Sequence, residues 1–214
     1  MGAMFAPDGV VSRWMSKFVN IVFINVLWIL CSLPVITIGA STTAMYSVVL
    51  KIVRDEDAYV AKSFFHSFAQ NFKQATAIWL LILAYSAVIL AEILFCIHGT
   101  GNGAKWFIIP AVLFAFIGVV TVTYVFPILS FFDDSIKVTI KNAFLMAVGH
   151  LPQTLLAIVI NLIPVFILWF FSGFLVLATF IDLVIGVAFC AWLNARHFRK
   201  IFDTYIPQEC LASE

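Results

Sequence analysis

The feature that most constrains this fold is a run of 33 residues without a charged side chain, from Phe18 to Leu50. A helix crosses the hydrocarbon core of a bilayer with about 20 mainly apolar residues. The run is longer than that, yet its centre reads SLPVITIGASTTAMY (32–46), with a proline, a glycine and several hydroxyl residues. Because proline and glycine interrupt a helix, this pattern predicts a turn inside the run instead of one long span.

Composition indicates that lipid is the main solvent of this chain. Apolar residues make up 64% and charged residues 11%, whereas soluble domains have about 45–50% and about 25%. The other charge-free runs cover residues 74–91, 106–132 and 142–181. The last run has the length of two spans, which we place at 152–171 and 174–195. The chain is therefore predicted to form a single all-α integral membrane domain, residues 1–214.

The distribution of lysine and arginine predicts how the chain is threaded. Segments on the cytoplasmic side carry an excess of these residues. If residues 18–50 form a hairpin with its tip at 34–43, eleven of the twelve basic residues lie on one side of the membrane, and Lys105 alone lies on the other. The bias therefore predicts six spans arranged as three hairpins, with the N- and C-termini in the cytoplasm.

The depth of the first hairpin leaves two alternatives open. The residues assigned to its turn are Pro34, Gly39, Ser41, Thr42 and Thr43. The returning arm from Ala44 to Val53 then covers only about 15 Å as a helix. Either the returning helix also includes the hydroxyl residues, or the segment is re-entrant and is covered by protein, because lipid does not tolerate uncovered backbone. A full hairpin is the expectation.

Amphipathic stretches precede each predicted hairpin, at residues 10–18, 58–73 and 135–150. Each combines apolar residues at helical spacing with a basic polar face. Such a helix lies in the membrane interface, with its apolar face toward the lipid. We therefore expect each hairpin to be preceded by an interfacial amphipathic helix.

Asp182 is the most informative candidate for a functional residue. It lies near the middle of the last predicted span, where an ionised carboxylate costs about 2.5–3.5 kcal/mol. No predicted span contains a lysine or arginine to pair with it, so Asn25 and Asn161, each inside a span, are its candidate partners. Two interpretations remain open: a polar intramembrane site that handles a proton or ion, or a hydrogen bond that joins two helices.

Catalytic and metal chemistry finds no support in the sequence. The four cysteines are scattered and form no CxxC pair, and the histidines lack metal-ligand spacing. No phosphate-binding loop and no nucleophile–base arrangement is visible. The sequence predicts no metal site, no cofactor and no enzymatic activity, and a net charge of +1 gives no reason to expect a nucleic-acid partner.

Two segments carry a resemblance to a known family. NVLWILCSLPVITIGASTTAMYSVVLKIVRDEDAYVAKSFFHSFAQNFKQAT (25–76) and YVFPILSFFDDSIKVTIKNAF (124–144) resemble the YesL-like family of bacterial integral membrane proteins, whose domain has no known function. One departure is that Ala40 and Ser41 follow Gly39, where the family has a proline. The resemblance implies a multi-pass protein of the bacterial cell membrane. It also implies sugar ABC-transporter subunits as partners, because family members are often encoded near them.

Two classes of function follow. The first is a non-catalytic accessory or assembly partner of a carbohydrate ABC-transport system. The alternative is a small transporter or channel with a polar pathway around Asp182. A transporter is expected to have a polar cavity that reaches both sides, whereas an accessory protein is expected to have a dry core and an apolar surface that matches its partner.

Overall fold

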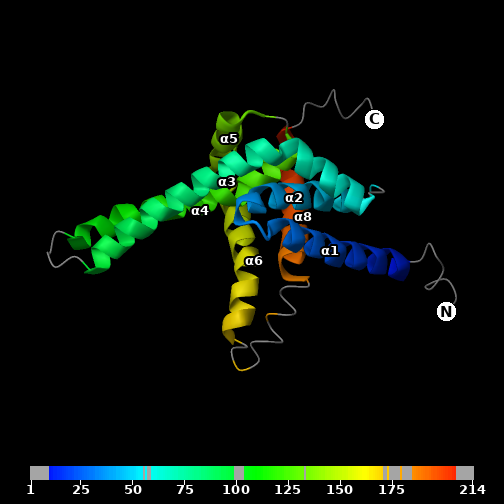
Figure 1. The fold of residues 1–214 in the computed structure, drawn as a ribbon, viewed down its shortest axis with the longest axis horizontal. Helices are drawn as coiled ribbons and strands as arrows, with labels where there is room; N and C mark the ends of the chain where they lie inside the picture. The colour runs from blue at the N-terminus through cyan, green and yellow to red at the C-terminus, as the bar shows by residue number, and fades with distance from the viewer. Residues whose placement is uncertain are drawn as a thin grey trace.

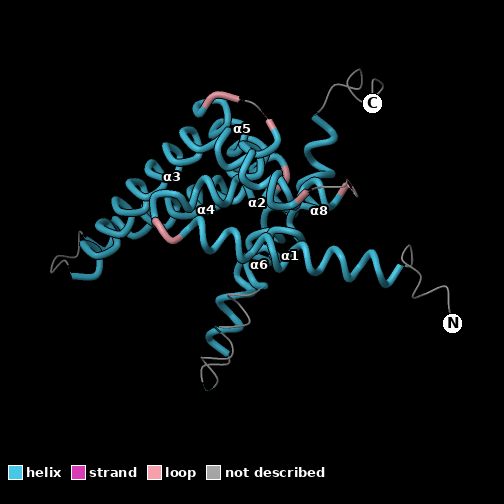
Figure 2. Tube along the Cα trace, turned by 45° about the vertical axis from the view of Figure 1, so that its right-hand side comes forward, coloured by secondary structure: helices cyan, strands magenta, loops and turns pink. Residues whose placement is uncertain are grey.

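The computed structural model describes residues 10–54, 56, 59–98, 104–132, 134–170, 173, 179 and 185–205. Within these residues the chain is helical and contains no strand, which confirms the all-α prediction (Figures 1 and 2). The α-helices are α1 Val10–Ser32, α2 Ile38–Val53, α3 Val60–His98, α4 Ile108–Phe131, α5 Ile136–Gly149, α6 Leu151–Phe170 and α8 Val187–Tyr205. Two 3₁₀ helices, η2 Val35–Thr37 and η3 Ala104–Phe107, lie in the connections.

Five of the described segments are long and apolar enough to cross a membrane. They are Trp14–Ser32, Val35–Val53, Val60–His98, Ile108–Phe131 and Leu151–Phe170. These segments make the chain a helical membrane protein. The predicted sixth span, 174–195, lies only partly within the described residues, so the six-span topology stays a prediction.

The first turn is shorter than the sequence predicts. Helix α1 ends at Ser32 and α2 begins at Ile38, so Pro34 lies in the turn. The other four residues assigned to the turn, Gly39, Ser41, Thr42 and Thr43, lie in α2 instead. The two threonines satisfy their hydroxyls inside the helix, because each donates to the carbonyl four residues earlier, at 2.7 and 3.0 Å. The returning helix therefore has 16 residues and includes the hydroxyl residues.

The turn between α1 and α2 has an apolar surface and a bonded backbone. Leu33 is 73% exposed and Val35 is 59% exposed. The Val35 carbonyl accepts a hydrogen bond from Trp79 Nε1 of α3 at 2.8 Å, and the Pro34 carbonyl accepts one from the Thr37 hydroxyl at 2.7 Å. Backbone that is bonded in this way tolerates an apolar environment, which a free turn does not.

Helix α2 lies at the centre of the packed core, against α1, α3, α4 and α8. Its side chains Ala40, Ala44, Val48 and Val49 are fully buried. Small side chains such as those of Ala40 and Ala44 let neighbouring helices approach closely in a membrane protein. The core is thus organised around α2, the helix that was predicted to extend only from Ala44 to Val53.

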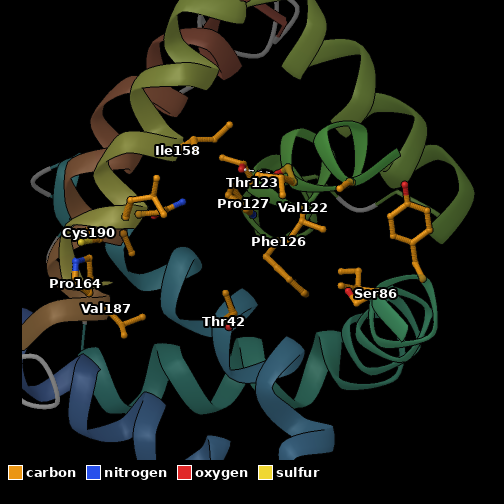
Figure 3. Close-up of a pocket in the computed structure, with 18 of the residues that line it drawn as sticks. Thr42, Ser86, Val122, Thr123, Phe126, Pro127, Ile158, Pro164, Val187 and Cys190 are labelled. Carbon is orange, nitrogen blue, oxygen red and sulfur yellow. Dashed lines mark hydrogen bonds between the residues drawn. The ribbon is translucent and has the colours of Figure 1, made fainter. Parts of the chain in front are cut away.

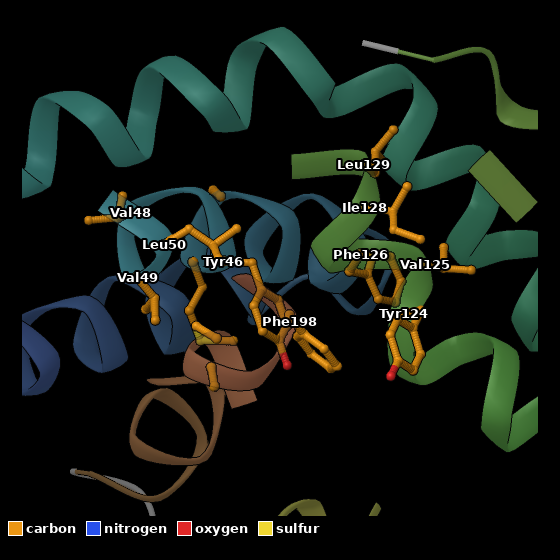
Figure 4. Packing of buried hydrophobic residues seen from close by; sticks show 14 of the residues in the cluster. Tyr46, Val48, Val49, Leu50, Tyr124, Val125, Phe126, Ile128, Leu129 and Phe198 are labelled. Carbon is orange, nitrogen blue, oxygen red and sulfur yellow. The ribbon is translucent and has the colours of Figure 1, made fainter. Parts of the chain in front are cut away.

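The last helix continues beyond its predicted end near residue 195, to Tyr205. Phe198, Ile201 and Phe202 recur at helical spacing and are buried, while the basic residues occupy the other positions. The Phe198 ring lies between Tyr46 and Tyr124, with centroid distances of 6.2 and 4.7 Å (Figure 4). The residues that follow the predicted end of the last span therefore supply part of the core, up to Phe202.

Only one of the three amphipathic stretches forms a separate helix. Helix α5 ends at Gly149, and His150 leaves helical geometry with φ −124° and ψ 48° before α6 begins. Stretches 10–18 and 58–73, by contrast, continue into the following spans within α1 and α3. No proline or glycine separates stretch from span in either helix, so nothing in the sequence interrupts the hydrogen-bond ladder.

The outer halves of α3 and α4 project from the core as a two-helix hairpin (Figures 1 and 2). We call residues 80–98 and 108–119 the α3–α4 arm. The Tyr85 hydroxyl joins its two helices by donating to the Phe114 carbonyl at 2.6 Å. Most side chains of the arm are exposed outside this contact, so the arm is surrounded mainly by lipid or by other molecules.

Candidate functional site

The main candidate site is a cleft between the α3–α4 arm and the body of the protein. It has a volume of about 740 Å³ and is lined by residues of α2, α3, α4, α6 and α8. Figure 3 shows Ser86 of the arm on one side of the cavity, opposite Pro164 and Cys190. Ligand sites in proteins commonly have volumes of about 300–1,000 Å³, mostly apolar walls and a few polar groups. The cleft has all three properties.

The polar side chains of the cleft are few, and none of its lining residues carries a charge. They are Thr42, Tyr46, Tyr85, Ser86, Thr123, Asn161 and Cys190. Thr42 and Thr123 donate to carbonyls of their own helices, at 2.7 and 2.8 Å. Tyr85 donates to the Phe114 carbonyl. Most of the hydroxyls are thus bonded within the protein.

An amide pair forms the polar part of the cleft wall. Asn194 Nδ2 of α8 donates to Asn161 Oδ1 of α6 at 2.8 Å. Asn161 is exposed at the cleft, whereas Asn194 is fully buried. Asn194 Oδ1 has no hydrogen-bond partner among the described residues, although the Asn194 side chain lies beside the Tyr46 hydroxyl. A buried acceptor without a donor is uncommon in native structures and calls for a physical explanation.

Asn25 has a different role from Asn161. Its side chain is 1% exposed, and its Oδ1 accepts a hydrogen bond from the Ala188 backbone N–H at 2.9 Å. That N–H belongs to the second residue of α8, which directly follows the π-helical residues 185 and 186. Asn25 therefore fixes the beginning of α8 to α1. The structure brings both predicted asparagines to α8, but to different parts of it.

Asp182 lies outside the described residues. Its pairing with Asn25 or Asn161 stays a prediction, and so does the proton or ion site that was built on it. Within the described part of the chain, no group of three histidine, cysteine, aspartate or glutamate side chains lies close enough to hold a metal ion.

Sequence analysis identified Asn161 but missed Asn194. The signal was present, because Asn194 is an amide within the predicted span 174–195. It was overlooked because that span was taken to end one residue later, where a polar side chain is ordinary. The cleft itself has no sequence signal, since its walls come from five separate helices.

Comparison with known proteins agrees with the resemblance found in the sequence. Residues 21–93 match the family described as "Protein of unknown function, DUF624". "Uncharacterized protein YesL" of Bacillus subtilis (strain 168) is 28% identical over 166 residues, covering 72% of this chain and 78% of the relative. "Uncharacterized protein YteU" of the same organism is 26% identical over 165 residues, covering 75% and 72%. No solved structure matches the chain.

The matched region contains the C-terminal half of α1, all of α2 and most of α3. It therefore includes the first hairpin, the central helix of the core and one wall of the cleft. Together with the two relatives, this match supports the resemblance of the chain to the YesL-like family, whose function is unknown.

Proposed function

We propose that the protein is a non-catalytic accessory or assembly partner of another membrane protein, in a carbohydrate ABC-transport system. The observation that carries this proposal is an exposed row of small residues on the α3–α4 arm. Ala84, Ala87 and Ala91 are all exposed. They are spaced by three and four residues, so they lie on one face of α3. Small residues four apart, such as the last two, are typical of helix–helix contacts in membranes.

This alanine face is separate from the cleft. Successive residues of a helix lie about 100° apart around its axis. On that spacing Ile82, Ser86 and Ile89, which line the cleft, lie on the side of α3 opposite the alanines. The alanine face therefore points away from the body of this protein.

A membrane-spanning helix of another protein is the partner that fits the alanine face. Lipid is as apolar as a leucine side chain, so helices in a membrane associate through close packing. In the most apolar stretch of α3, only 6% of the residues are buried within this chain. The arm thus retains surface for a second helix, and alanines allow the backbones to come close.

The link to sugar uptake has a separate basis, the family resemblance, which implies sugar ABC-transporter subunits as neighbours. The alternative, a small transporter with a pathway around Asp182, receives less support from the described residues. The cleft lining carries no charge, and most of its hydroxyls are bonded within the protein.

The role of the alanine face in partner binding is tested by replacing its alanines with larger side chains. We expect Ala87→Leu combined with Ala91→Leu to lower the recovery of transporter subunits with the tagged protein about tenfold, because bulk there costs about 1.4 kcal/mol of packing. The measurement is affinity purification from native membranes with quantitative mass spectrometry. Val112→Leu, which adds bulk at an exposed position on the other helix of the arm, α4, is the matched control. Equal recovery from the double variant and the control would disprove the role of the alanine face.

Orientation in the membrane is a further prediction of the proposal. With both termini in the cytoplasm, a cysteine at position 102 reacts with a membrane-impermeant thiol reagent in intact cells, and a cysteine at position 213 does not. The substitutions are Asn102→Cys and Ser213→Cys, each in a chain without its native cysteines. Labelling at position 213 but not at position 102 would show that the chain has the opposite orientation.

A further inference from the structure

We infer that the cleft is a binding site for an uncharged amphipathic lipid, meaning a long apolar molecule with one hydroxyl or amide group, such as a long-chain alcohol or a diacylglycerol. The site lies on the face of α3 opposite the alanines. The inference therefore does not depend on the proposed partner, and either one can fail without the other.

The walls of the cleft select an apolar body. Ile89 and Ile93 of α3, Val122 of α4, Ile158 of α6 and Val187 of α8 are among the residues that enclose it. A buried water molecule needs two to four polar partners, and these five side chains offer none. Hydrocarbon is the filling that loses no hydrogen bonds there.

The amide pair selects one neutral polar group. Asn161 stands at the cleft wall and is bonded through its Oδ1 to Asn194. Behind it, Asn194 Oδ1 is buried without a donor among the described residues, and Tyr46, which also lines the cleft, lies beside Asn194. A hydroxyl or amide group at this wall can accept a hydrogen bond from the amide nitrogen of Asn161, whose Oδ1 is already bonded to Asn194.

The absence of charge from the lining excludes ionic head groups. A carboxylate, phosphate or ammonium group would leave its hydration and find no opposite charge among the lining residues. An uncharged group loses far less hydration free energy when it enters the cleft, and its hydrogen bonds to the amide pair offset that loss.

The size of the cleft favours a hydrocarbon chain over a helix of a partner protein. A helix about 10 Å wide that rises 5.4 Å per turn occupies roughly 420 Å³ per turn. A span of more than five turns therefore occupies more than roughly 2,100 Å³, which is more than the cleft can hold. A flexible chain has no such requirement and can follow the cleft.

The test uses the purified full-length protein in lipid nanodiscs with a diazirine-labelled hexadecanol. After photolysis, mass spectrometry locates the modified peptides. We expect labelling at the cleft residues of α3, α4 and α6, with competition by unlabelled dioleoylglycerol. Asn161→Leu, which keeps the size but removes the amide, should reduce cleft labelling about three- to tenfold. Ile89→Trp, which fills the cavity, should reduce it as well, and Ala87→Leu is the control that should leave it unchanged.

Folding and specificity are checked in the same samples. Asn161→Gln keeps an amide and should restore labelling, which a merely damaged fold would not allow. A diazirine probe with a quaternary ammonium head group should label the cleft at least about threefold less than the alcohol. Equal labelling by both probes, equal labelling of Asn161→Leu, or modification spread evenly over the lipid-facing surface would each overturn the inference. Cross-linking of the cleft to a protein in native membranes, with exclusion of the alcohol, would overturn it too.

Discussion

Gly39→Leu is expected to prevent α2 from packing against α3 and to leave little folded protein after extraction in detergent. A Cβ at this position would lie 2.6 Å from the Ala75 carbonyl oxygen and 2.7 Å from Trp79 Cβ. The first contact is with backbone, which cannot turn away as a side-chain tip does. Even Gly39→Ala should destabilise the protein by about 1–3 kcal/mol, as overpacking commonly does. Thermal unfolding in detergent, followed by intrinsic fluorescence, measures both variants.

Gly149→Ala is the matched control for this prediction. A Cβ at Gly149, the last residue of α5, meets nothing within 4 Å. Alanine also favours the helix over glycine by up to about 1 kcal/mol, so the variant should be as stable as the parent or slightly more stable. Unchanged stability of Gly39→Ala would show that α2 and α3 are not held as closely as the structure has them.

Asn25→Leu is the second substitution expected to have a large effect. Leucine has a similar size but offers no acceptor to the Ala188 N–H, which Asn25 Oδ1 binds at 2.9 Å. A buried donor left without a partner costs about 1–3 kcal/mol. Because this bond joins residues 163 positions apart, its loss should separate the beginning of α8 from α1 before the remaining core unfolds. Hydrogen exchange followed by mass spectrometry should show faster exchange in the peptide that contains Ala188.

Asn71→Leu provides the comparison for Asn25. Within the described part of the chain, Asn71 Nδ2 bonds to Ser67 of its own helix, with the closer contact at 3.2 Å. Replacing it removes no link between helices, and the expected change in stability is within about 0.5 kcal/mol. Similar losses for the two variants would assign the effect to leucine itself and not to the α1–α8 bond.

The sequence predicts the helices of this protein well because charge is so costly in lipid. The charge-free run 74–91 lies within α3. The run 106–132 begins in η3, continues through α4 and ends one residue after it. The predicted helix 152–171 differs from α6 by one residue at each end. Pro34 marks the first turn for the same reason that it marks turns elsewhere, since it interrupts the hydrogen-bond ladder.

The extent of the first turn was harder to predict because hydroxyl residues have two uses. Serine and threonine are common in turns, but in a helix they can also donate to the carbonyl of the preceding turn. Thr42 and Thr43 do the latter. The choice between these uses depends on packing, and Gly39 and Ala40 are buried against α3 and the rest of the core. Such contacts between distant segments leave no local pattern in the sequence.

The candidate site was predictable only in part. Asn161 stands out in the sequence because an amide is costly inside an apolar span. Its partner Asn194 lies 33 residues further along the chain, and nothing in their spacing predicts that they meet. The cleft depends on the angle at which the α3–α4 arm leaves the core, a property of the whole packing that no single segment determines.

The length of α3 has a mechanical consequence. Its 39 residues extend over about 58 Å, while the hydrocarbon core is about 30 Å thick. The helix has no break between the packed end at Phe64 and the alanines of the arm. A rotation of the Phe64 end about the helix axis therefore turns the alanine face through a similar angle. Because α3 is continuous over this length, its two ends cannot turn independently about the helix axis.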